Sequence, residues 1–376
     1  METTPYRTWV EISREQIARN YRNVRAAVGP DVEIAAVVKS DAYGHGAVEV
    51  SRILEREGAR WFAVSTAEEG IALRRAGIAA DILVMADSLP FIQESLAEFR
   101  LTPVVHALED LPALDEFAAR LAAPLKFHLK IDSGMGRLGT RSSAATIAYA
   151  LAAAPHVALD GLMSHFASAA DYSTARSDKQ VRAFNRLSAD LRKLGVNPAH
   201  RHMSGTTPIA YARREAWHNM VRPGHALYGY LSMARGDAPP RILEVAPAIA
   251  WKARVLAVKD LPAGALVGYG GMFRTERATR IAILGAGYAD GLPHRLSNRG
   301  NAIAGGKLVP ILGAVSMDLT TIDVTDCPAI APGGCVTLLG SEGEASINAQ
   351  EMARMAGTIS YDVLCGIRTR VKRVYV

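Results

Sequence analysis

A lysine follows a short apolar run near the start of the chain. Ile34–Val38 has no polar interruption, which is typical of a strand buried on both faces of a parallel sheet. Lys39 comes next and opens a loop that contains Gly44 and Gly46. Burial of the lysine stem would lower the pKa of the amine, and a neutral amine can attack a carbonyl group to form a Schiff base. On this run alone the plainer interpretation, a lysine that extends into solvent, is favoured.

Polar and cationic residues also follow other apolar runs in the first part of the chain. They are Tyr43 after the first run, Lys130, Asp132 and Arg137 at the fifth, His165 at the sixth, Ser204, Gly205 and Thr206 after the seventh, and Arg222 and Gly224 at the eighth. If the runs are strands of one barrel, their C-terminal ends meet on one face, where the active sites of such barrels lie. We therefore expect these side chains to form one site.

The loops after the seventh and eighth runs suit a phosphate group. They contain Ser204–Thr207 and Arg222–His225, and phosphate sites in (β/α)8 barrels are often built from these two loops. Small hydroxyl side chains and exposed backbone N–H groups can bind a dianion. The alternative is that both segments are ordinary turns.

Short apolar runs alternate with helical stretches over residues 1–241. An amphipathic helix is predicted at residues 10–25 with Ser13 as its N-cap, and seven of the eight runs after it are clearly followed by a helix. This alternation predicts parallel strands and a (β/α)8 barrel, with a doubly wound sheet as the alternative. The runs are Ile34–Lys39, Phe62–Val64, Ile82–Met85, Leu101–Val105, Leu125–Ile131, Leu159–Met163, His200–Ser204 and Met220–Arg222.

Residues 242–376 have a different pattern, which predicts a small, mainly-β domain. Glycine and proline separate its short β-rich runs, and one helix is expected after a capping box formed by Asn348 and Glu351. Tyr269, Tyr288, Met317 and Tyr361 stand in turn-like segments, where each tyrosine alone is more often a packed turn residue than a catalyst. The β-rich runs are Ile249–Val258, Arg280–Leu284, Leu308–Leu312, Thr320–Val324, Val336–Leu339 and Val371–Tyr375.

Composition describes an ordinary globular protein. Of 376 residues 49% are hydrophobic and 21% are charged, and the net charge of +6 is scattered among acidic residues, which argues against nucleic-acid binding. We expect no secretory signal, no membrane span and no metal site, because the three cysteines form no ligand pair. These features favour a reducing cytoplasm.

The segment Val37-Val-Lys-Ser-Asp-Ala-Tyr-Gly-His-Gly46 resembles the pyridoxal-phosphate lysine segment of alanine racemases. Leu129–Gly139, Arg222-Pro-Gly, Tyr228-Gly and Gly287-Tyr-Ala-Asp-Gly291 are similar to further segments of that family, in the same order along nearly the whole chain. The resemblance implies a pyridoxal-phosphate-dependent isomerase that interconverts L-alanine and D-alanine for peptidoglycan synthesis, as a cytoplasmic homodimer with shared active sites.

The resemblance also implies catalytic and substrate-binding residues. Lys39 would hold pyridoxal phosphate as an aldimine and act as one acid/base, and Tyr269 of the other subunit would be the second on the opposite face. Arg137 and the backbone N–H of Met317 would bind the substrate carboxylate. Lys130 would be carbamylated and orient Arg137.

A further set of residues would hold the cofactor according to the same resemblance. Arg222 would face the pyridine nitrogen, with His165 behind it, and a cation there would keep that nitrogen unprotonated. The phosphate would be held by Tyr43, Thr206, Gly224 and Tyr361, and by the backbone alone of His225.

The sequence departs from the family pattern at three places, and rival functions remain. Ser204-Gly-Thr replaces the usual segment after the seventh run, so the phosphate hydroxyl could belong to Ser204 or Thr206. Gly268 and Leu319 are also unusual, which leaves substrate preference open. The rivals are a racemase of the same fold for serine or basic amino acids, a barrel decarboxylase, which would need an acidic residue in place of Arg222, and a pyridoxal-phosphate carrier without a second domain.

Overall fold

Eight parallel strands form the central sheet of the first part of the chain, in a computed structural model that describes residues 5–87 and 90–376. Their order is β10-β2-β3-β4-β5-β6-β7-β9. The segments that follow the two outer strands, β10 and β9, are joined by a hydrogen bond of 2.8 Å from the Arg222 N–H to the Ser204 carbonyl. The sheet is therefore a nearly closed barrel. The strands are β2 (Glu33–Val37), β3 (Trp61–Val64), β4 (Asp81–Val84), β5 (Thr102–Val105), β6 (Leu125–Lys130), β7 (Val157–Met163), β9 (His200–His202) and β10 (Met220–Val221).

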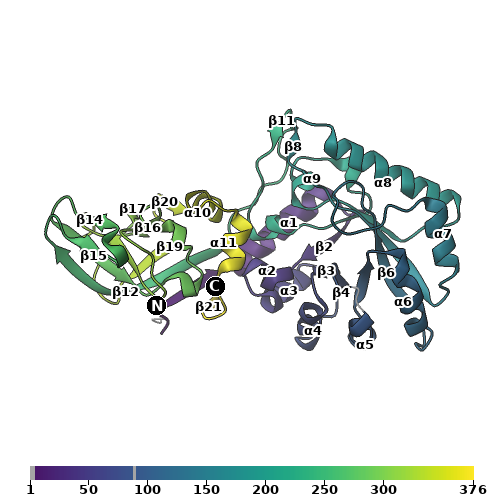
Figure 1. Cartoon of the computed structure of the whole chain (residues 1–376), viewed down its shortest axis with the longest axis horizontal. Helices are drawn as coiled ribbons and strands as arrows, with labels where there is room; N and C mark the ends of the chain where they lie inside the picture. The colour runs from purple at the N-terminus through teal and green to yellow at the C-terminus, as the bar shows by residue number, and fades with distance from the viewer. Residues whose placement is uncertain (1–4, 88–89) are drawn as a thin grey trace. The chain divides into compact units, whose positions relative to one another are not determined.

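Helices surround these strands, as Figure 1 shows for α3 to α8. The predicted (β/α)8 barrel is confirmed, and each of the eight predicted runs overlaps one of its strands. The helices are α1 (Arg14–Val28), α3 (Ala47–Arg56), α4 (Ala67–Arg75), α5 (Gln93–Glu98), α6 (Leu111–Ala118), α7 (Ala144–Ala152), α8 (Arg176–Lys193) and α9 (Thr206–Ala210).

The barrel is held by apolar side chains on both faces of its strands. All four residues of β3 are buried, and Phe62, Phe127 and Phe184 are completely enclosed. Each such side chain stabilises the fold by about 1.5–3 kcal/mol relative to exposure. A continuous apolar run such as that of β3 is typical of a strand buried on both faces, whereas β9 is the polar sequence His-Arg-His.

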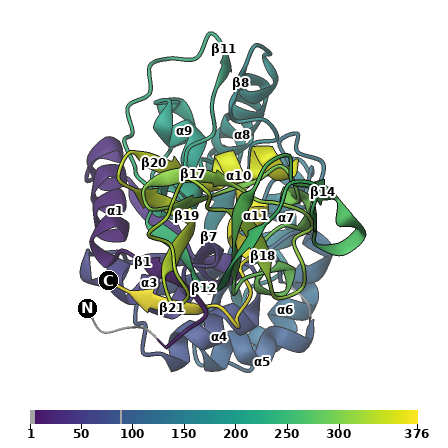
Figure 2. The same cartoon turned by 90° about the vertical axis from the view of Figure 1, so that its left-hand side faces the viewer.

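A second, strand-rich unit contains the rest of the chain. Its nine-stranded sheet has the path β17-β16-β19-β12-β1-β21, with β15, β18 and β20 attached beside it. Figure 2 shows its strands with the two helices α10 (Ala349–Ala356) and α11 (Ser360–Gly366). The strands are β1 (Thr8–Ile12), β12 (Ile249–Leu261), β15 (Thr279–Leu284), β16 (Asn301–Ala304), β17 (Lys307–Pro310), β18 (Thr320–Asp323), β19 (Cys335–Glu342), β20 (Ala345–Ile347) and β21 (Lys372–Tyr375).

The first strand of this unit differs from the sequence prediction. Residues 8–12 form β1, antiparallel to β12 and parallel to β21, whereas a helix was predicted from residue 10. Helix α1 begins at Arg14 instead. The predicted capping box is confirmed, because the Asn348 side chain accepts from the Glu351 N–H and Glu351 accepts from the Asn348 N–H.

Contacts assign three segments to the β unit and two to the barrel unit. The β unit comprises the described residues up to Arg14, Tyr43–Gly46 and Pro247–Val376, and the barrel unit comprises Glu15–Ala42 and Ala47–Ala246. The domain boundary between residues 241 and 242 stays a prediction, and the first four residues, where a secretory signal was sought, lie outside the described chain. Over residues 5–87 and 90–376, no helix is both long and apolar enough to cross a membrane.

Candidate active site

Lys39 begins a turn of left-handed backbone at the end of β2. The residues Ser40–Ala42 have φ of 51–52° and ψ of 47–51°, which costs about 1–2 kcal/mol for each residue with a side chain. The turn is fixed by neighbouring elements: the Ser40 N–H donates to Glu69 Oε1 at 2.6 Å, and the Val38 N–H donates to the Ala63 carbonyl at 3.0 Å. Strained backbone of this kind persists only where its surroundings hold it, and it clusters at functional sites.

Arg222 is a buried cation with neutral partners. It follows β10 and is 4% exposed. Its guanidinium contacts His202 Nδ1 at 2.5 Å, donates to the Ser164 carbonyl at 2.6 Å, and lies 3.3 Å from His165 Nδ1. In the part of the chain that the structure describes, no carboxylate pairs with it. Burial lowers the pKa of Arg222 to about 9, so it stays charged at neutral pH and its charge is uncompensated.

His165 is neutral beside this arginine. Burial and the charges of Arg222 and Lys130 lower the pKa of His165 to about 3. Because its Nδ1 faces an Arg222 donor, we assign the ring proton to Nε2. The imidazole therefore adds no further positive charge at this edge of the barrel.

Two more histidines continue from Arg222 into the barrel interior. His202 Nδ1 accepts from Arg222, so we assign its proton to Nε2, which lies 2.8 Å from His128 Nδ1. The His128 proton is then on Nε2, which faces Asp160 Oδ2 at 3.7 Å. Burial lowers the pKa of both histidines, and the nearby His128 N–H and Lys126 lower the pKa of Asp160 to about 2. One orientation of neutral rings thus extends from the buried cation to His128, whose Nε2 lies 3.7 Å from the Asp160 carboxylate.

The backbone of β7 makes room for this connection. The pairing of β6 with β7 shifts by one residue, because Phe127 pairs with Leu159 and His128 pairs with Gly161, which leaves Asp160 as a bulge. A β-bulge redirects a side chain out of the regular alternation. Gly161 has no side chain at the place where a Cβ would lie 2.5 Å from the His128 ring.

Lys130 is a second buried cation at the C-terminal end of the strands. It ends β6 and is 4% exposed. Burial and the charges of Arg222 and Arg137 lower the pKa of Lys130 to about 7. Within the described residues, no hydrogen bond or ion pair engages its ammonium group. A lysine amine that is neutral near pH 7 can react as a nucleophile, for example with carbon dioxide.

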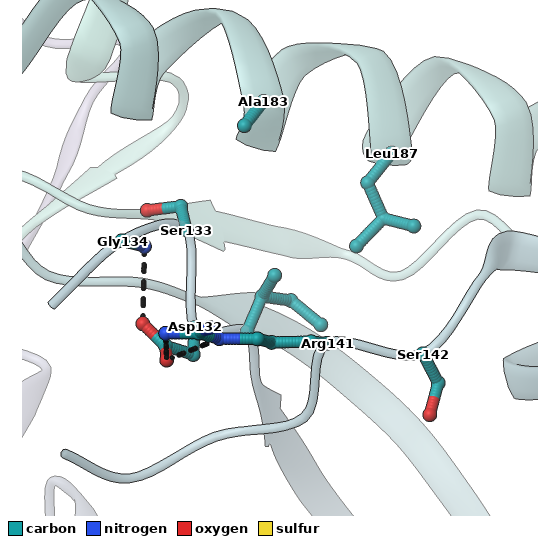
Figure 3. Close-up of a pocket in the computed structure, with 8 residues that line it drawn as sticks. Asp132, Ser133, Gly134, Arg141, Ser142, Ala183 and Leu187 are labelled. Carbon is teal, nitrogen blue, oxygen red and sulfur yellow. Dashed lines mark hydrogen bonds and ion pairs between the residues drawn. The ribbon is translucent and has the colours of Figure 1, made fainter. Parts of the chain in front are cut away.

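Asp132 organises the loop that follows β6. Its Oδ1 accepts the N–H groups of residues 134–136 at 2.8–3.0 Å, and its Oδ2 accepts from Arg141 Nε at 2.8 Å (Figure 3). Although burial raises its pKa, these hydrogen bonds lower the pKa of Asp132 to about 2. Arg137, which was predicted to bind substrate, lies exposed on this loop.

A cavity of about 410 Å³ lies between this loop and α8. Ala183 and Leu187 project into it from the helix in Figure 3. Of the residues expected to form one site at the strand ends, Asp132 alone lines this cavity, so the cavity lies beside the loop after β6 and not around Lys39. Its lining residues are Ile131, Asp132, Ser133, Gly134, Arg141, Ser142, Ala183 and Leu187.

Thr206 joins the loops after β9 and β10. Its Oγ1 accepts from the Gly224 N–H at 3.2 Å and the Ala226 N–H at 3.1 Å, which leaves its own hydrogen available to an anion. Ser204 is completely buried and its hydroxyl donates to the Ala216 carbonyl at 2.7 Å. Of the two candidate hydroxyls, only that of Thr206 is therefore suited to an anion.

The N–H groups of the first turn of α9 are also suited to an anion. The helix begins at Thr206, and its N-cap, Gly205, provides no side-chain acceptor for them. The buried imidazole of His225 stacks on Tyr230 with ring centroids 5.1 Å apart. This position of the ring is consistent with the expectation that His225 contributes its backbone only.

The β unit contains the remaining predicted residues. The rings of Tyr43 and Tyr361 lie 5.8 Å apart, and burial raises the pKa of Tyr43. Tyr269 is 78% exposed, and Met317 is also exposed. No backbone or side-chain acceptor in the described chain takes the Met317 N–H, so that donor is available.

Sequence reasoning missed the interior residues of the site. His128 and His202 lie within strands, and the signal that could have found them was a histidine inside a run predicted to be a strand. It also missed His106 after β5, whose pKa is lowered by burial and by the charge of Lys130. No group of side chains in residues 5–87 and 90–376 is arranged to hold a metal ion.

Comparison with known proteins gives one consistent family. Residues 12–232 match the alanine racemase N-terminal domain, and residues 248–375 match the alanine racemase C-terminal domain. The chain is 39% identical to an alanine racemase of Carboxydothermus hydrogenoformans over 368 residues, which cover 98% of this chain and 99% of that protein.

Solved structures agree with the sequence comparison. Alanine racemase of Bacillus anthracis with bound L-Ala-P has a TM-score of 0.90 at 34% identity, covering 99% of this chain and 96% of the other. Alanine racemase of Bartonella henselae with covalently bound pyridoxal phosphate has a TM-score of 0.86 at 27% identity, covering 99% of this chain and all of the other.

Proposed function

Because the chain belongs to the alanine racemase family, we propose that it interconverts L-alanine and D-alanine with pyridoxal phosphate as its cofactor. The observation that carries the proposal is the buried positive charge of Arg222, which no carboxylate pairs within the described residues and which lies at the same end of the barrel strands as Lys39. Such an edge is suited to an anionic cofactor and an anionic substrate group.

The residues present fit pyridoxal phosphate. Thr206 and the first turn of α9 offer donors to the phosphate, and we propose that the segment from Gly224 to His225 lies against it. Tyr43 and Tyr361 would complete the phosphate ligands. The covalently bound pyridoxal phosphate of the Bartonella protein supports covalent attachment here, and we propose Lys39 as the attachment point.

Racemisation needs a base on each face of the substrate α-carbon. When bound, pyridoxal phosphate draws electrons from that carbon and makes its hydrogen acidic. We assign the amine of Lys39 to one face and the phenol of Tyr269 to the other, so that one removes a proton and the other returns one. The exposure of Tyr269 on its own unit supports its use by a second copy of the chain, in a homodimer with shared sites.

Substrate orientation would come from two donors. The Arg137 guanidinium and the free N–H of Met317 would bind the carboxylate of alanine. We propose that Lys130 carries a carbamate that orients Arg137, since its lowered pKa keeps an appreciable fraction of the amine neutral near pH 7. The carbamate would also bring a negative charge among Arg222, Lys39 and Arg137.

Arg222 would face the ring nitrogen of the cofactor. Its fixed charge disfavours a proton on that nitrogen, because adjacent cations repel. His165 would lie behind it as a neutral ring. A cationic residue here argues against a decarboxylase, and the complete β unit argues against a cofactor carrier.

We place the reaction in the cytoplasm, where D-alanine would supply peptidoglycan synthesis. Alanine is favoured over serine or basic amino acids as the substrate by the Carboxydothermus relative, which is an alanine racemase, and by the Bacillus anthracis structure with bound L-Ala-P. A racemase of broader specificity is the alternative, and a panel of amino acids would separate the two.

One experiment tests the proposal directly. Purified holoenzyme is given L-alanine and, separately, D-alanine, and the approach to an equal mixture is followed by polarimetry. A second sample is reduced with borohydride, digested and analysed by mass spectrometry, and the cofactor mass is expected on the peptide that contains Lys39. Absence of racemisation in both directions, or cofactor mass on another lysine, contradicts the proposal.

A further inference from the structure

The segment Gly287–Gly291 was singled out in the sequence but has no role in the proposed mechanism. It contains Asp290, a carboxylate that is 1% exposed. We propose that Asp290, with Arg7 and Arg370, is a positioning residue that fixes the turn carrying Met317, so that the Met317 N–H is directed at the substrate carboxylate. This inference rests on the proposed function of Met317.

Asp290 is held by three donors. Arg7 Nη2 lies 3.0 Å from both of its oxygens, and Arg370 Nε lies 3.0 Å from Oδ1. The Gly287 N–H donates to Oδ2 at 2.9 Å, which closes the segment on itself. A buried carboxylate with this many partners has one defined position.

The same two arginines also hold the turn that carries Met317. Arg370 Nη2 donates to Asp318 Oδ1 at 2.8 Å, and Arg7 donates to the Asp318 carbonyl at 3.2 Å and to its carboxylate at 3.3 Å. Asp318 directly follows Met317. The cluster of Arg7, Asp290, Asp318 and Arg370 has no net charge, so it can place the turn without adding a field that attracts the substrate.

Backbone contacts transmit the position of Asp290 to the turn. The Tyr288 N–H donates to the Ser316 carbonyl and the Ala289 N–H donates to the Met317 carbonyl, both at 2.9 Å. A side chain at position 287 has no room, because its Cβ would lie 2.3 Å from the Ser316 carbonyl oxygen. The two segments are therefore packed backbone to backbone.

This packing leaves one backbone N–H group of the turn without an acceptor within the described residues. The turn is closed by the Ser316 N–H donating to the Leu319 carbonyl at 2.9 Å, and the Met317 carbonyl is occupied by Ala289. The Met317 N–H has no acceptor within the described residues. Displacing Asp290 would move this donor while leaving the sheet of the β unit intact.

The test uses holoenzyme and two small probes. Propionate has the carboxylate of alanine without the amine, and ethylamine has an amine without a carboxylate. Both are titrated while the visible absorption of the bound cofactor is followed, on the wild type, Arg370→Ala and Asp290→Asn. The Arg370 side chain is 45% exposed, so its removal leaves no buried void. Arg370→Ala can therefore still be measured if Asp290→Asn fails to fold.

We expect both variants to raise the Kd of propionate about tenfold, the size of one weakened hydrogen bond to a charged group, and to leave the Kd of ethylamine within about twofold. The KM for alanine should rise in parallel with the Kd of propionate. The matched control is Arg277→Ala, which removes an exposed ion pair to Asp326 on the same unit and should change neither constant.

Two results overturn the inference. If both probes weaken equally together with a lower melting temperature, the cluster is only structural, and if neither probe weakens, the cluster does not place the donor. Both results leave the proposed function standing, provided that the wild type racemises alanine and binds propionate. A wild type that does neither overturns the proposed function and this inference with it.

Discussion

The two units treat charge in opposite ways. In the barrel unit, Arg222 and Lys130 are buried, and the described residues place no carboxylate against either of them. In the β unit, the charges of Arg7 and Arg370 are matched by Asp290 and Asp318 at 2.8–3.3 Å. Both units bury or partly bury arginines, but only in the β unit are the arginine charges paired with carboxylates.

The difference indicates which unit is incomplete without a ligand. A buried cation without a partner lowers the stability of the fold until an anion arrives, whereas a paired cluster gains nothing from one. The barrel unit is therefore the part of the molecule that should be stabilised by an anionic cofactor. The paired charges of the β unit are already satisfied without a ligand.

The largest expected effect comes from removing Lys39. Lys39→Ala should lower racemisation by about 10³-fold or more, because it removes both the proposed general base and the proposed cofactor attachment. Borohydride reduction followed by mass spectrometry should then find no cofactor mass on the chain. Lys193→Ala, which changes an exposed lysine of the same unit, is the control and should behave as the wild type. Retained activity and retained cofactor in Lys39→Ala would end the assignment.

The division of the two bases between the units can be tested by mixing dead variants. Lys39→Ala and Tyr269→Phe should each be nearly inactive. In a mixed dimer with shared sites, one site receives both substitutions and the other receives neither, because two-fold contacts are reciprocal. Random mixing makes half of the dimers mixed, and each has one intact site, so about a quarter of normal activity should return.

Mixed dimers are prepared by dissociation and reassociation of subunits that carry two different affinity tags, and are then isolated through both tags. The isolated species should have about half of wild-type activity, since one of its two sites is intact. If isolated mixed dimers stay as inactive as their parents, Tyr269 does not serve the other subunit.

Reversing the charge at Arg222 tests whether this buried cation faces the ring nitrogen of the cofactor. Arg222→Glu should slow racemisation by about 10²-fold, and a carboxylate should favour a proton on the ring nitrogen. Pyruvate formation from alanine should increase as a side reaction. Arg222→Lys keeps a positive charge and should form less pyruvate than Arg222→Glu. Unchanged pyruvate in both variants would mean that Arg222 does not face the ring.

Lys130 should make part of the activity depend on carbon dioxide. Lys130→Ala is expected to lower activity about tenfold, with partial rescue by added acetate, because a carboxylate would again pair with Arg137. Labelled bicarbonate should give a carbamate signal in carbon NMR of the wild type that Lys130→Ala lacks. A wild type with no such signal under saturating carbon dioxide would contradict the carbamate.

The pH dependence of this site follows from the lowered pKa. The Lys130 amine loses its proton near pH 7 in the folded protein. In the unfolded chain the same amine loses its proton near pH 10.4, so between these two pH values the unfolded state binds more protons than the folded state. The contribution of Lys130 to the free energy of unfolding therefore rises between pH 7 and about pH 10.4, and it is lowest below pH 7. At fixed carbon dioxide pressure, carbamate occupancy should rise from pH 6 to pH 8, as the neutral amine increases.

Much of the barrel could be predicted, because parallel strands buried on both faces are continuous apolar runs. The cations at the strand ends could be predicted for the same reason, since the end of each run placed Lys39, Lys130 and Arg222 on one edge. The strand Thr8–Ile12 could not, because its partners lie more than two hundred residues away and its short pattern merges with the helix that follows.

The contacts between residues in the interior of the site could not be predicted from the sequence either. Whether His128 and His202 face each other depends on strand register, and the bulge at Asp160 changes that register, for which Gly161 within the strand was the only sequence signal. Likewise, four charges of the β unit come from distant segments, and only folding brings Arg7 to Asp290. Pairings of this kind are set by tertiary structure and not by local pattern.

The smallest predicted effect concerns the connection from Arg222 to Asp160. Gly161→Ala would place a Cβ 2.5–2.7 Å from the His128 ring, so the ring must move and its 2.8 Å contact to His202 must lengthen. Because Arg222 keeps its other acceptors, we expect only about a threefold loss in kcat, equivalent to roughly 0.65 kcal/mol. A direct role of residue 161 and a role through His128 are separated by a double-mutant cycle with His128→Ala. In that background the added methyl has no ring to displace, so Gly161→Ala should change kcat by less than about 1.5-fold. An undiminished threefold loss would show that the glycine matters to the strand alone, and that the two histidines do not support the charge of Arg222.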